Sequence, residues 1–175
     1  MRIIAGKHRG RALAQFAGND VRPTPDRVKE SVFQIIGANL VGARVLDLFC
    51  GSGALGLESL SRGAKEAVFN DVSRESLIIL KKNLAALREE ARATNLDYRA
   101  CLAQSGGAFD VIFCDPPYKT DCAAEILSLI ASYRRLTAGG IVVYESEREE
   151  TPPEGWERYD LRSYGRTKVA FFRMV

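Results

Sequence analysis

The chain has 175 residues, of which 46% are hydrophobic and 27% are charged, and these values are typical of one soluble globular domain that can bury a full core. The amino terminus lacks the apolar stretch of a secretory signal, and no apolar run reaches the ~18 residues of a membrane-spanning helix, so we expect a cytoplasmic protein without membrane contacts. Four cysteines without C-x-x-C spacing and a single histidine argue against a structural zinc site, and we expect no metal.

The positive charge of the chain is concentrated at its amino terminus. Residues 1–30 contain seven basic and three acidic residues, a net charge of +4, whereas the whole chain carries +3. A basic end of this kind indicates contact with a polyanion such as a nucleic acid, although a solvated basic hairpin would have the same composition.

The predicted elements begin with a short hairpin over residues 2–16 and continue with a helix that starts at Thr24, with Pro25 in its first position. We therefore divide the chain into an extension, residues 1–23, and one compact unit, residues 24–175. Strands and helices then alternate. The predicted strands are 44–49, 67–71, 96–102, 110–114 and 141–145, and the predicted helices are 54–61, 73–91 and 121–134. This alternation predicts a mainly parallel sheet covered on both faces, and two consecutive strands, 158–163 and 168–174, predict a terminal antiparallel hairpin.

A glycine-rich loop follows the strand at 44–49. Gly51, Gly53 and Gly56 fit the pattern G-x-G-x-x-G, which makes a tight turn and lets a cofactor approach the backbone closely. Asp71 ends the next strand, where a carboxylate can accept hydrogen bonds from ribose hydroxyls. A nicotinamide cofactor would fit these features too, but Asp47 would repel its pyrophosphate and would attract the cationic amino acid moiety of S-adenosylmethionine. The loop therefore favours S-adenosylmethionine.

The strand at 110–114 runs directly into the sequence Asp115-Pro116-Pro117-Tyr118. The two prolines fix φ and donate no hydrogen bonds, so the loop is stiff and its carbonyl groups are free to accept. An exocyclic base amine is a poor nucleophile, because its lone pair is delocalised into the ring. Asp115 and the carbonyl of Pro116 would hold its N–H bonds, and Tyr118 would stack on an extruded base. The segment predicts methyl transfer to a base amine by in-line displacement, in which positioning supplies most of the rate.

These segments resemble the RsmD family, the bacterial small-subunit ribosomal RNA guanine-N2 methyltransferases, over nearly the whole chain. The resemblance is carried by residues 2–11, 22–30, 47–58, 115–118 and 144–146. It implies a Rossmann-like class-I S-adenosylmethionine-dependent methyltransferase fold, an α/β fold with a mostly parallel seven-stranded sheet, a terminal antiparallel hairpin and a basic N-terminal β-hairpin extension. It also implies methylation of the N2 amine of one particular guanine in 16S rRNA, in the small ribosomal subunit or its assembly intermediate.

The resemblance assigns site residues by motif. The residues expected to bind the cofactor are Asp47, Phe49, Gly51, Ser52, Gly53 and Asp71. The residues expected to hold the guanine are Asp115, Pro116, Pro117 and Tyr118. The residues expected to contact RNA are Arg2, Lys7, His8, Arg9, Arg11, Arg22 and Arg27. Relatives usually carry an acidic residue after the third strand that meets the adenine amino group. No acid follows a third strand at 96–102, so adenine recognition rests either on backbone groups or on a third strand placed elsewhere.

Three other functions stay open at this point. A DNA adenine-N6 methyltransferase would use the same Asp-Pro-Pro-Tyr sequence, but such enzymes usually need extra sequence to select a DNA site. A nucleotide-dependent oxidoreductase is disfavoured by Asp47 and by the lack of a substrate domain. A non-catalytic RNA-binding protein on a methyltransferase scaffold is disfavoured by the intact sequence at 115–118.

Overall fold

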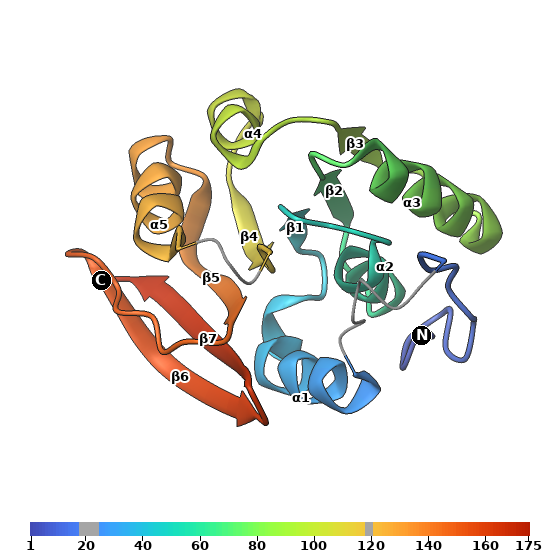
Figure 1. Ribbon diagram of the computed structural model, residues 1–175, viewed down its shortest axis with the longest axis horizontal. Helices are drawn as coiled ribbons and strands as arrows, with labels where there is room; N and C mark the ends of the chain where they lie inside the picture. The colour runs from blue at the N-terminus through green and yellow to red at the C-terminus, as the bar shows by residue number, and fades with distance from the viewer. Residues whose placement is uncertain (18–24, 118–120) are drawn as a thin grey trace.

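The computed structural model describes residues 1–17, 25–117 and 121–175 of the chain (Figure 1). The helices and strands, in chain order, are α1 (Asp26–Ile36), the 3₁₀ turn η1 (Gly37–Asn39), β1 (Arg44–Asp47), α2 (Ala54–Ser61), β2 (Glu66–Asn70), α3 (Arg74–Leu87), β3 (Arg92–Thr94), α4 (Tyr98–Gln104), β4 (Phe109–Cys114), α5 (Ala123–Ser132), β5 (Leu136–Ser146), β6 (Trp156–Tyr164) and β7 (Thr167–Met174). Among the described residues, no helix combines the length and the apolar character needed to cross a bilayer.

The strands form one seven-stranded sheet in the order β3-β2-β1-β4-β5-β7-β6. The five strands from β3 to β5 are parallel to their neighbours, and β7 runs antiparallel to both β5 and β6. The predicted α/β fold, with a mostly parallel sheet and a terminal antiparallel hairpin, is confirmed. The strand order reverses between β1 and β4, and ligands of open α/β sheets bind beyond the carboxyl ends of the strands at such a point.

Helices cover both faces of the sheet (Figure 1). Side chains alternate along each strand, so Val45 and Val111 enter one apolar core and Leu46 and Ile112 enter the other. We call the core under α1, α2 and α3 the first core, and the core under α4 and α5 the second core. This alternation identifies the face on which each polar side chain at a strand end lies.

Most predicted helices begin and end close to the observed positions. The predicted helix 54–61 coincides with α2, and Ser73 caps α3 as expected, because its Oγ accepts a hydrogen bond from Ser76 N at 3.3 Å. Pro25 lies immediately before α1 instead of in its first position. The predicted start at Thr24 lies outside the described residues.

The strand predicted at 96–102 is wrong. Most of this segment belongs to α4, which begins after Asp97, whose Oδ1 accepts hydrogen bonds from Arg99 N at 2.9 Å and Ala100 N at 3.1 Å. The apolar residues of the segment, which suggested a strand, instead bury Cys101 and Leu102 in the second core. The third strand is β3, three residues of the sheet edge that are only half-buried or exposed and so carry no apolar signal.

The amino-terminal segment, residues 1–17, forms a hairpin with a single antiparallel bridge, between Arg2 and Ala12. Ile3 and Leu13 are buried in the first core, so this segment is packed onto the sheet domain. Gly6 has φ +85°, and a Cβ atom there would lie 1.8 Å from the carbonyl oxygen of Ser61. Only glycine therefore fits at this position.

Candidate active site

Three carboxyl side chains meet at the carboxyl edge of the central strands. Cys114 of β4 is paired with Tyr144 of β5, so Asp115 and Glu145 follow at adjacent positions. Because Cys114 and Tyr144 enter the second core, alternation turns Asp115 and Glu145 toward the first-core side of the sheet. Asp47 of β1 lies on the same side, because the residues before and after it enter the second core. Burial raises the pKa of Asp115 most, and the charges of Glu145 and Asp47 raise it further, as expected for groups in one site.

Asp47 is the innermost of these carboxyl groups. It is 2% exposed, and its Oδ2 accepts a hydrogen bond from Gly56 N at 2.9 Å. Burial raises the pKa of Asp47 to about 7, against the opposing effect of that hydrogen bond. A cation bound beside it would favour the ionised form, so this carboxylate suits a positively charged ligand.

The three glycines of the loop after β1 differ in what surrounds them. A Cβ atom at Gly53 would lie 2.4 Å from Leu80, and a Cβ atom at Gly56 would lie 2.3 Å from the ring of Phe69. Gly51 has φ +53° and open space where a Cβ atom would point. Gly53 and Gly56 therefore permit close packing, whereas Gly51 leaves the backbone accessible to a ligand.

Asp71, at the end of β2, holds this loop in place. Its Oδ2 accepts a hydrogen bond from Gly51 N at 2.8 Å, and its Oδ1 accepts one from Ser73 N at 2.8 Å. A carboxylate oxygen has two lone pairs, so each oxygen retains one for a ribose hydroxyl. Ser52, next in the loop, is tied by its carbonyl oxygen to Asn83 Nδ2 at 2.9 Å. The predicted cofactor residues thus lie in the segment from Asp47 to Gly53 and in Asp71, which braces that segment from the end of β2.

An acidic residue does follow the third strand, contrary to the expectation from a strand at 96–102. β3 ends at Thr94, and Asp97 comes three residues later. Asn95 Nδ2 donates to the carbonyl oxygens of Asp71 at 2.9 Å and Val72 at 2.8 Å, which holds this segment beside the end of β2. Oδ1 of Asp97 caps α4, and its Oδ2 makes no hydrogen bond within the described residues. With the third strand placed at 96–102, Asp97 could not be recognised as an acid that follows this strand. Its position immediately before a helix was the signal that could have identified it.

Phe49 and Tyr98 form an aromatic wall near the same edge. Phe49 is half-buried, and its ring centroid lies 5.8 Å from that of Tyr98, the first residue of α4. Phe49 was predicted as a cofactor residue, whereas Tyr98 was missed, because its placement depends on the helix that the sequence pattern did not reveal.

The loop after β4 carries the predicted methyl-acceptor residues. Asp115 is half-buried, Pro116 is buried and Pro117 is exposed. Tyr118 lies outside the described residues. Burial raises the pKa of Asp115 well above its usual range, and the neighbouring Glu145 raises it further. Glu145 is 8% exposed, and burial raises its pKa to about 7.

The residues predicted to contact RNA fall into two groups. Lys7 and His8 both contact Glu89, with His8 Nε2 at 2.6 Å from its Oε1, and the His8 side chain is only 16% exposed. Arg11 Nη2 donates to the carbonyl oxygen of Ala86 at 2.7 Å. These three side chains hold the amino-terminal segment against the end of α3.

The second group is more accessible. Arg9 and Arg27 are exposed and make no ion pair within the described residues. Arg2 Nε lies 3.4 Å from Asp26, and both side chains are exposed. Arg22 lies outside the described residues. Of the predicted RNA-contact residues that the structure describes, Arg2, Arg9 and Arg27 are therefore the exposed cations that are not used to hold the segment against α3.

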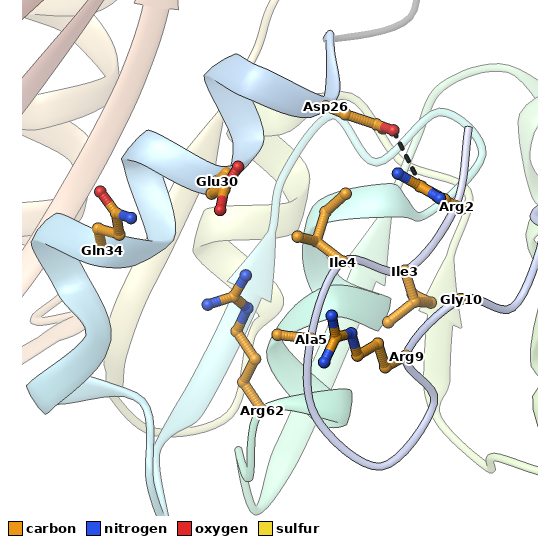
Figure 2. A pocket seen from close by; sticks show the side chains of 10 residues that line it. All are labelled: Arg2, Ile3, Ile4, Ala5, Arg9, Gly10, Asp26, Glu30, Gln34 and Arg62. Atoms are coloured by element: carbon orange, nitrogen blue, oxygen red, sulfur yellow. Dashed lines mark ion pairs between the residues drawn. The ribbon is translucent and has the colours of Figure 1, made fainter.

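A cleft of about 430 Å³ separates the amino-terminal segment from α1. Figure 2 shows Arg2, Arg9 and Arg62 on one side of it and Asp26 and Glu30 of α1 on the other. Because a guanidinium wall faces a carboxylate wall, the cleft is not a simple phosphate site. Arg62 on the basic wall is only 18% exposed and is paired with Glu58, so it adds no free cation to this face of the molecule.

The chain is similar to known proteins over almost its whole length. A family model described as Conserved hypothetical protein 95 matches residues 1–173. Ribosomal RNA small subunit methyltransferase D from Escherichia coli (strain K12) is 38% identical over 177 residues, which cover 99% of this chain and 89% of the relative. The Haemophilus influenzae protein of the same name is 37% identical over 163 residues, which cover 89% of this chain and 84% of the relative.

Solved structures agree. The protein yhhF from Escherichia coli aligns with a TM-score of 0.90 at 36% identity, covering 99% of this chain and 97% of its own. A hypothetical protein from Thermus thermophilus aligns with a TM-score of 0.84 at 32% identity, covering 98% of both chains. These alignments include the amino-terminal segment as well as the sheet.

Proposed function

The chain belongs to the Conserved hypothetical protein 95 family, the family of ribosomal RNA small subunit methyltransferase D, and from this premise we propose that it transfers the methyl group of S-adenosylmethionine to the N2 amine of a guanine in 16S rRNA. Methylation of small-subunit rRNA follows from the family. The donor and the guanine N2 acceptor are proposed from the site. The observation that carries them is the position of Asp115-Pro116-Pro117, at the strand end beside the glycine loop of β1.

The residues around the glycine loop fit S-adenosylmethionine as a ligand. Asp47 would pair with the amino group of its methionine moiety, and this cation would lower the pKa of the buried carboxyl. Asp71 would accept the ribose hydroxyls with the lone pairs that Gly51 and Ser73 leave free. Asp97 would accept the adenine amino group through Oδ2. When bound, the donor supplies a methyl group on a cationic sulfur that is ready for displacement.

Asp115 and Pro116 would act on the methyl acceptor. The carboxylate of Asp115 and the carbonyl oxygen of Pro116 would accept the N–H bonds of the amine and so direct its lone pair out of the ring plane. Fixed acceptors of this kind lower the activation barrier of methyl transfer, because they hold the amine in the orientation that the reaction requires. The methylated amine is acidic, and the raised pKa of Asp115 suits this carboxylate to accept the released proton.

The basic face would bring the RNA to this edge of the sheet. Arg2 and Arg9 on the amino-terminal segment and Arg27 on α1 are exposed, and arginines bind phosphates through charge-assisted hydrogen bonds. The substrate would be a cytoplasmic small ribosomal subunit or its assembly intermediate. The target guanine would have to leave its stack to reach the loop after β4.

The test is transfer of labelled methyl from S-adenosylmethionine to undermethylated 30S particles, naked 16S rRNA and duplex DNA, followed by nucleoside digestion. We expect N2-methylguanosine on the ribosomal substrate, and we expect the Asp115→Ala variant to lose at least about 100-fold in rate. Glu157→Ala, which removes an exposed carboxylate of β6, is the matched control and should keep full activity.

The other outcomes separate the rival functions. N6-methyladenine on DNA would overturn the rRNA substrate and keep the chemistry. Binding of 30S particles without transfer to any substrate would overturn the enzymatic function and favour an RNA-binding protein on this scaffold. An Asp115→Ala variant as active as the Glu157→Ala variant would overturn the role of the loop after β4.

A further inference from the structure

Glu145 is the penultimate residue of β5 and lies beside the proposed methyl-acceptor loop, and no step of the proposed methyl transfer uses it. The pairing of Cys114 with Tyr144 places Asp115 and Glu145 next to each other at the carboxyl edge. Tyr144 points into the second core, so Glu145 points to the other side of the sheet, the side of Asp115 and Asp47. On its other flank it is paired with Val169 of β7, which belongs to the first core and offers no charge.

The carboxyl group of Glu145 has no partner within the described residues, although it is not fully enclosed as Oε1 of Glu150 is. Glu145 is 8% exposed and makes no ion pair or hydrogen bond within residues 1–17, 25–117 and 121–175. Burial of an unpaired carboxylate is unfavourable, and the elevated pKa of Glu145 expresses this effect. Acids with raised pKa values at the carboxyl edge of such a sheet are typical of groups that meet a ligand.

Guanine can supply hydrogen-bond donors to the carboxylate of Glu145. The Watson–Crick edge of guanine presents two parallel donors, N1–H and one N–H of the N2 amine, and a carboxylate can accept both. Asp115 and Pro116 would still accept the two N–H bonds of this amine, and Glu145 would share the N–H that lies beside N1 with one of them. Adenine presents an amine beside N1, which is an acceptor, so a carboxylate would face a lone pair there.

We propose that Glu145 is a specificity-determining residue, whose carboxylate accepts N1–H and N2–H of the target guanine and so selects a 2-amino-6-oxopurine over purines with an unprotonated N1. This inference rests on the proposed function and assigns the base recognition within it. Sites built to hydrogen-bond a polar edge reject analogues that lack it strongly, because the site's own buried group is then left unpaired.

The test keeps the reacting atom and changes only the neighbouring edge. Small-subunit RNA carries either guanosine or 2-aminopurine riboside at the methylated position, and both bases present an amine at C2, but 2-aminopurine has a bare N1. We expect wild-type kcat/KM to fall at least about 100-fold with 2-aminopurine. Glu145→Gln should lower kcat/KM for guanosine about 10- to 100-fold. It should also raise the relative activity on 2-aminopurine at least tenfold, because the amide N–H donates to N1 and its carbonyl accepts N2–H.

Glu150→Gln is the matched control, because Glu150 follows β5, is 9% exposed and has a buried Oε1 without a partner among the described residues, but influences Tyr144 and Cys122 of the second-core side. Its base preference should equal that of the wild type. A Glu145→Gln variant that loses activity on both bases equally, or a Glu150→Gln variant that shifts the preference as much, would overturn the assignment. Absence of transfer to guanosine by the wild type would instead overturn the proposed function, so the two failures are distinguishable.

Discussion

Two buried glutamates, Glu58 on α2 and Glu145 at the end of β5, have opposite surroundings. Glu58 is completely buried, and its Oε1 accepts hydrogen bonds from Ala5 N at 3.0 Å and Arg62 Nε at 2.8 Å. Its Oε2 accepts one from Ile4 N at 2.9 Å and lies 3.4 Å from Lys29 Nζ. Glu145 has none of this within the described residues.

Burial alone therefore does not identify a reactive acid. A buried carboxylate surrounded by four donors is a structural anchor, and here it fixes the amino-terminal segment between α1 and α2. A buried carboxylate without donors is maintained at a cost to stability, and function explains why it persists. The molecule thus has one satisfied acidic region and one unsatisfied acidic region on the same side of its sheet.

The largest effect is expected from breaking the satisfied region. Glu58→Ala leaves Lys29 buried without its counter-ion and removes the acceptor of Ile4 N and Ala5 N. We expect the free energy of unfolding to fall by about 3–5 kcal/mol, measured by urea denaturation. Glu66→Ala removes an exposed pair with Arg44 and should cost at most about 1 kcal/mol. Equal losses in the two variants would contradict the anchor role of Glu58.

The next effect tests the unsatisfied region through Asp47. Because burial raises its folded-state pKa to about 7, ionised Asp47 destabilises the fold. This penalty is absent below the unfolded-state pKa of about 4, grows as pH rises toward 7 and is constant above it. Asp47→Asn removes the penalty and should be more stable than the wild type at pH 8, by at most about 4 kcal/mol. The two proteins should converge near pH 4.

Thermal unfolding between pH 4 and pH 8 measures this difference, and calorimetric titration with S-adenosylmethionine provides the functional readout. The Asp47→Asn variant should bind the donor more weakly although it is more stable at pH 8. A stability difference that does not change with pH would contradict ionisation of Asp47 as its source.

A smaller effect is expected from displacing the backbone N–H groups of Ile4 and Ala5, which donate to Glu58. Gly6→Ala places a Cβ atom against the carbonyl oxygen of Ser61 and also strains a φ of +85°. We expect a loss of about 2–3 kcal/mol in urea denaturation and faster hydrogen exchange at Ile4 and Ala5. Gly10→Ala has a similar φ, +81°, but open space around its Cβ, so it should cost only about 1 kcal/mol. If Gly10→Ala were equally damaging, strain alone would explain both losses.

The smallest effect concerns single cations on the amino-terminal segment. Arg9 is exposed and unpaired within the described residues, whereas His8 contacts Glu89. Arg9→Ala should weaken binding to 16S rRNA and reduce the slope of log K against log salt by about one. His8→Gln should leave that slope unchanged, and filter binding at several salt concentrations measures both. A slope that falls for His8→Gln and not for Arg9→Ala would reverse the assignment of these side chains.

Much of the fold and of the cofactor loop was predictable because their signals are local. The strand at 44–49, the glycines after it and Asp115-Pro116-Pro117 are contiguous in sequence, and alternation of strands with helices restricts the topology. The third strand was not predictable in this way. β3 is a short edge strand without an apolar pattern, so the stronger apolar signal after Asp97 was assigned to a strand although it forms α4.

The roles of the two glutamates depend on partners distant in sequence. Nothing near residue 58 indicates that Lys29, Ile4 and Ala5 converge on its carboxylate, and nothing near residue 145 indicates that Asp115 is its neighbour. Likewise, the position of His8 among basic residues suggested contact with RNA. In the structure its side chain instead hydrogen-bonds to Glu89, 81 residues later. Pairings of this kind become visible only when the sheet order is known.

The anchoring of the amino-terminal segment has a consequence for biosynthesis. Apart from the contacts of Arg2 with Asp26 and Lys29, the hydrogen-bond partners cited for this segment lie 53 to 81 residues further along the chain, on α2, on α3 and just beyond it. Translation proceeds from the amino terminus, so this segment emerges first and cannot complete its docking until the polypeptide has grown past residue 89. The residues made earliest therefore wait for partners that are made much later, and the nascent chain exposes its basic end while the core of the sheet is still being synthesised.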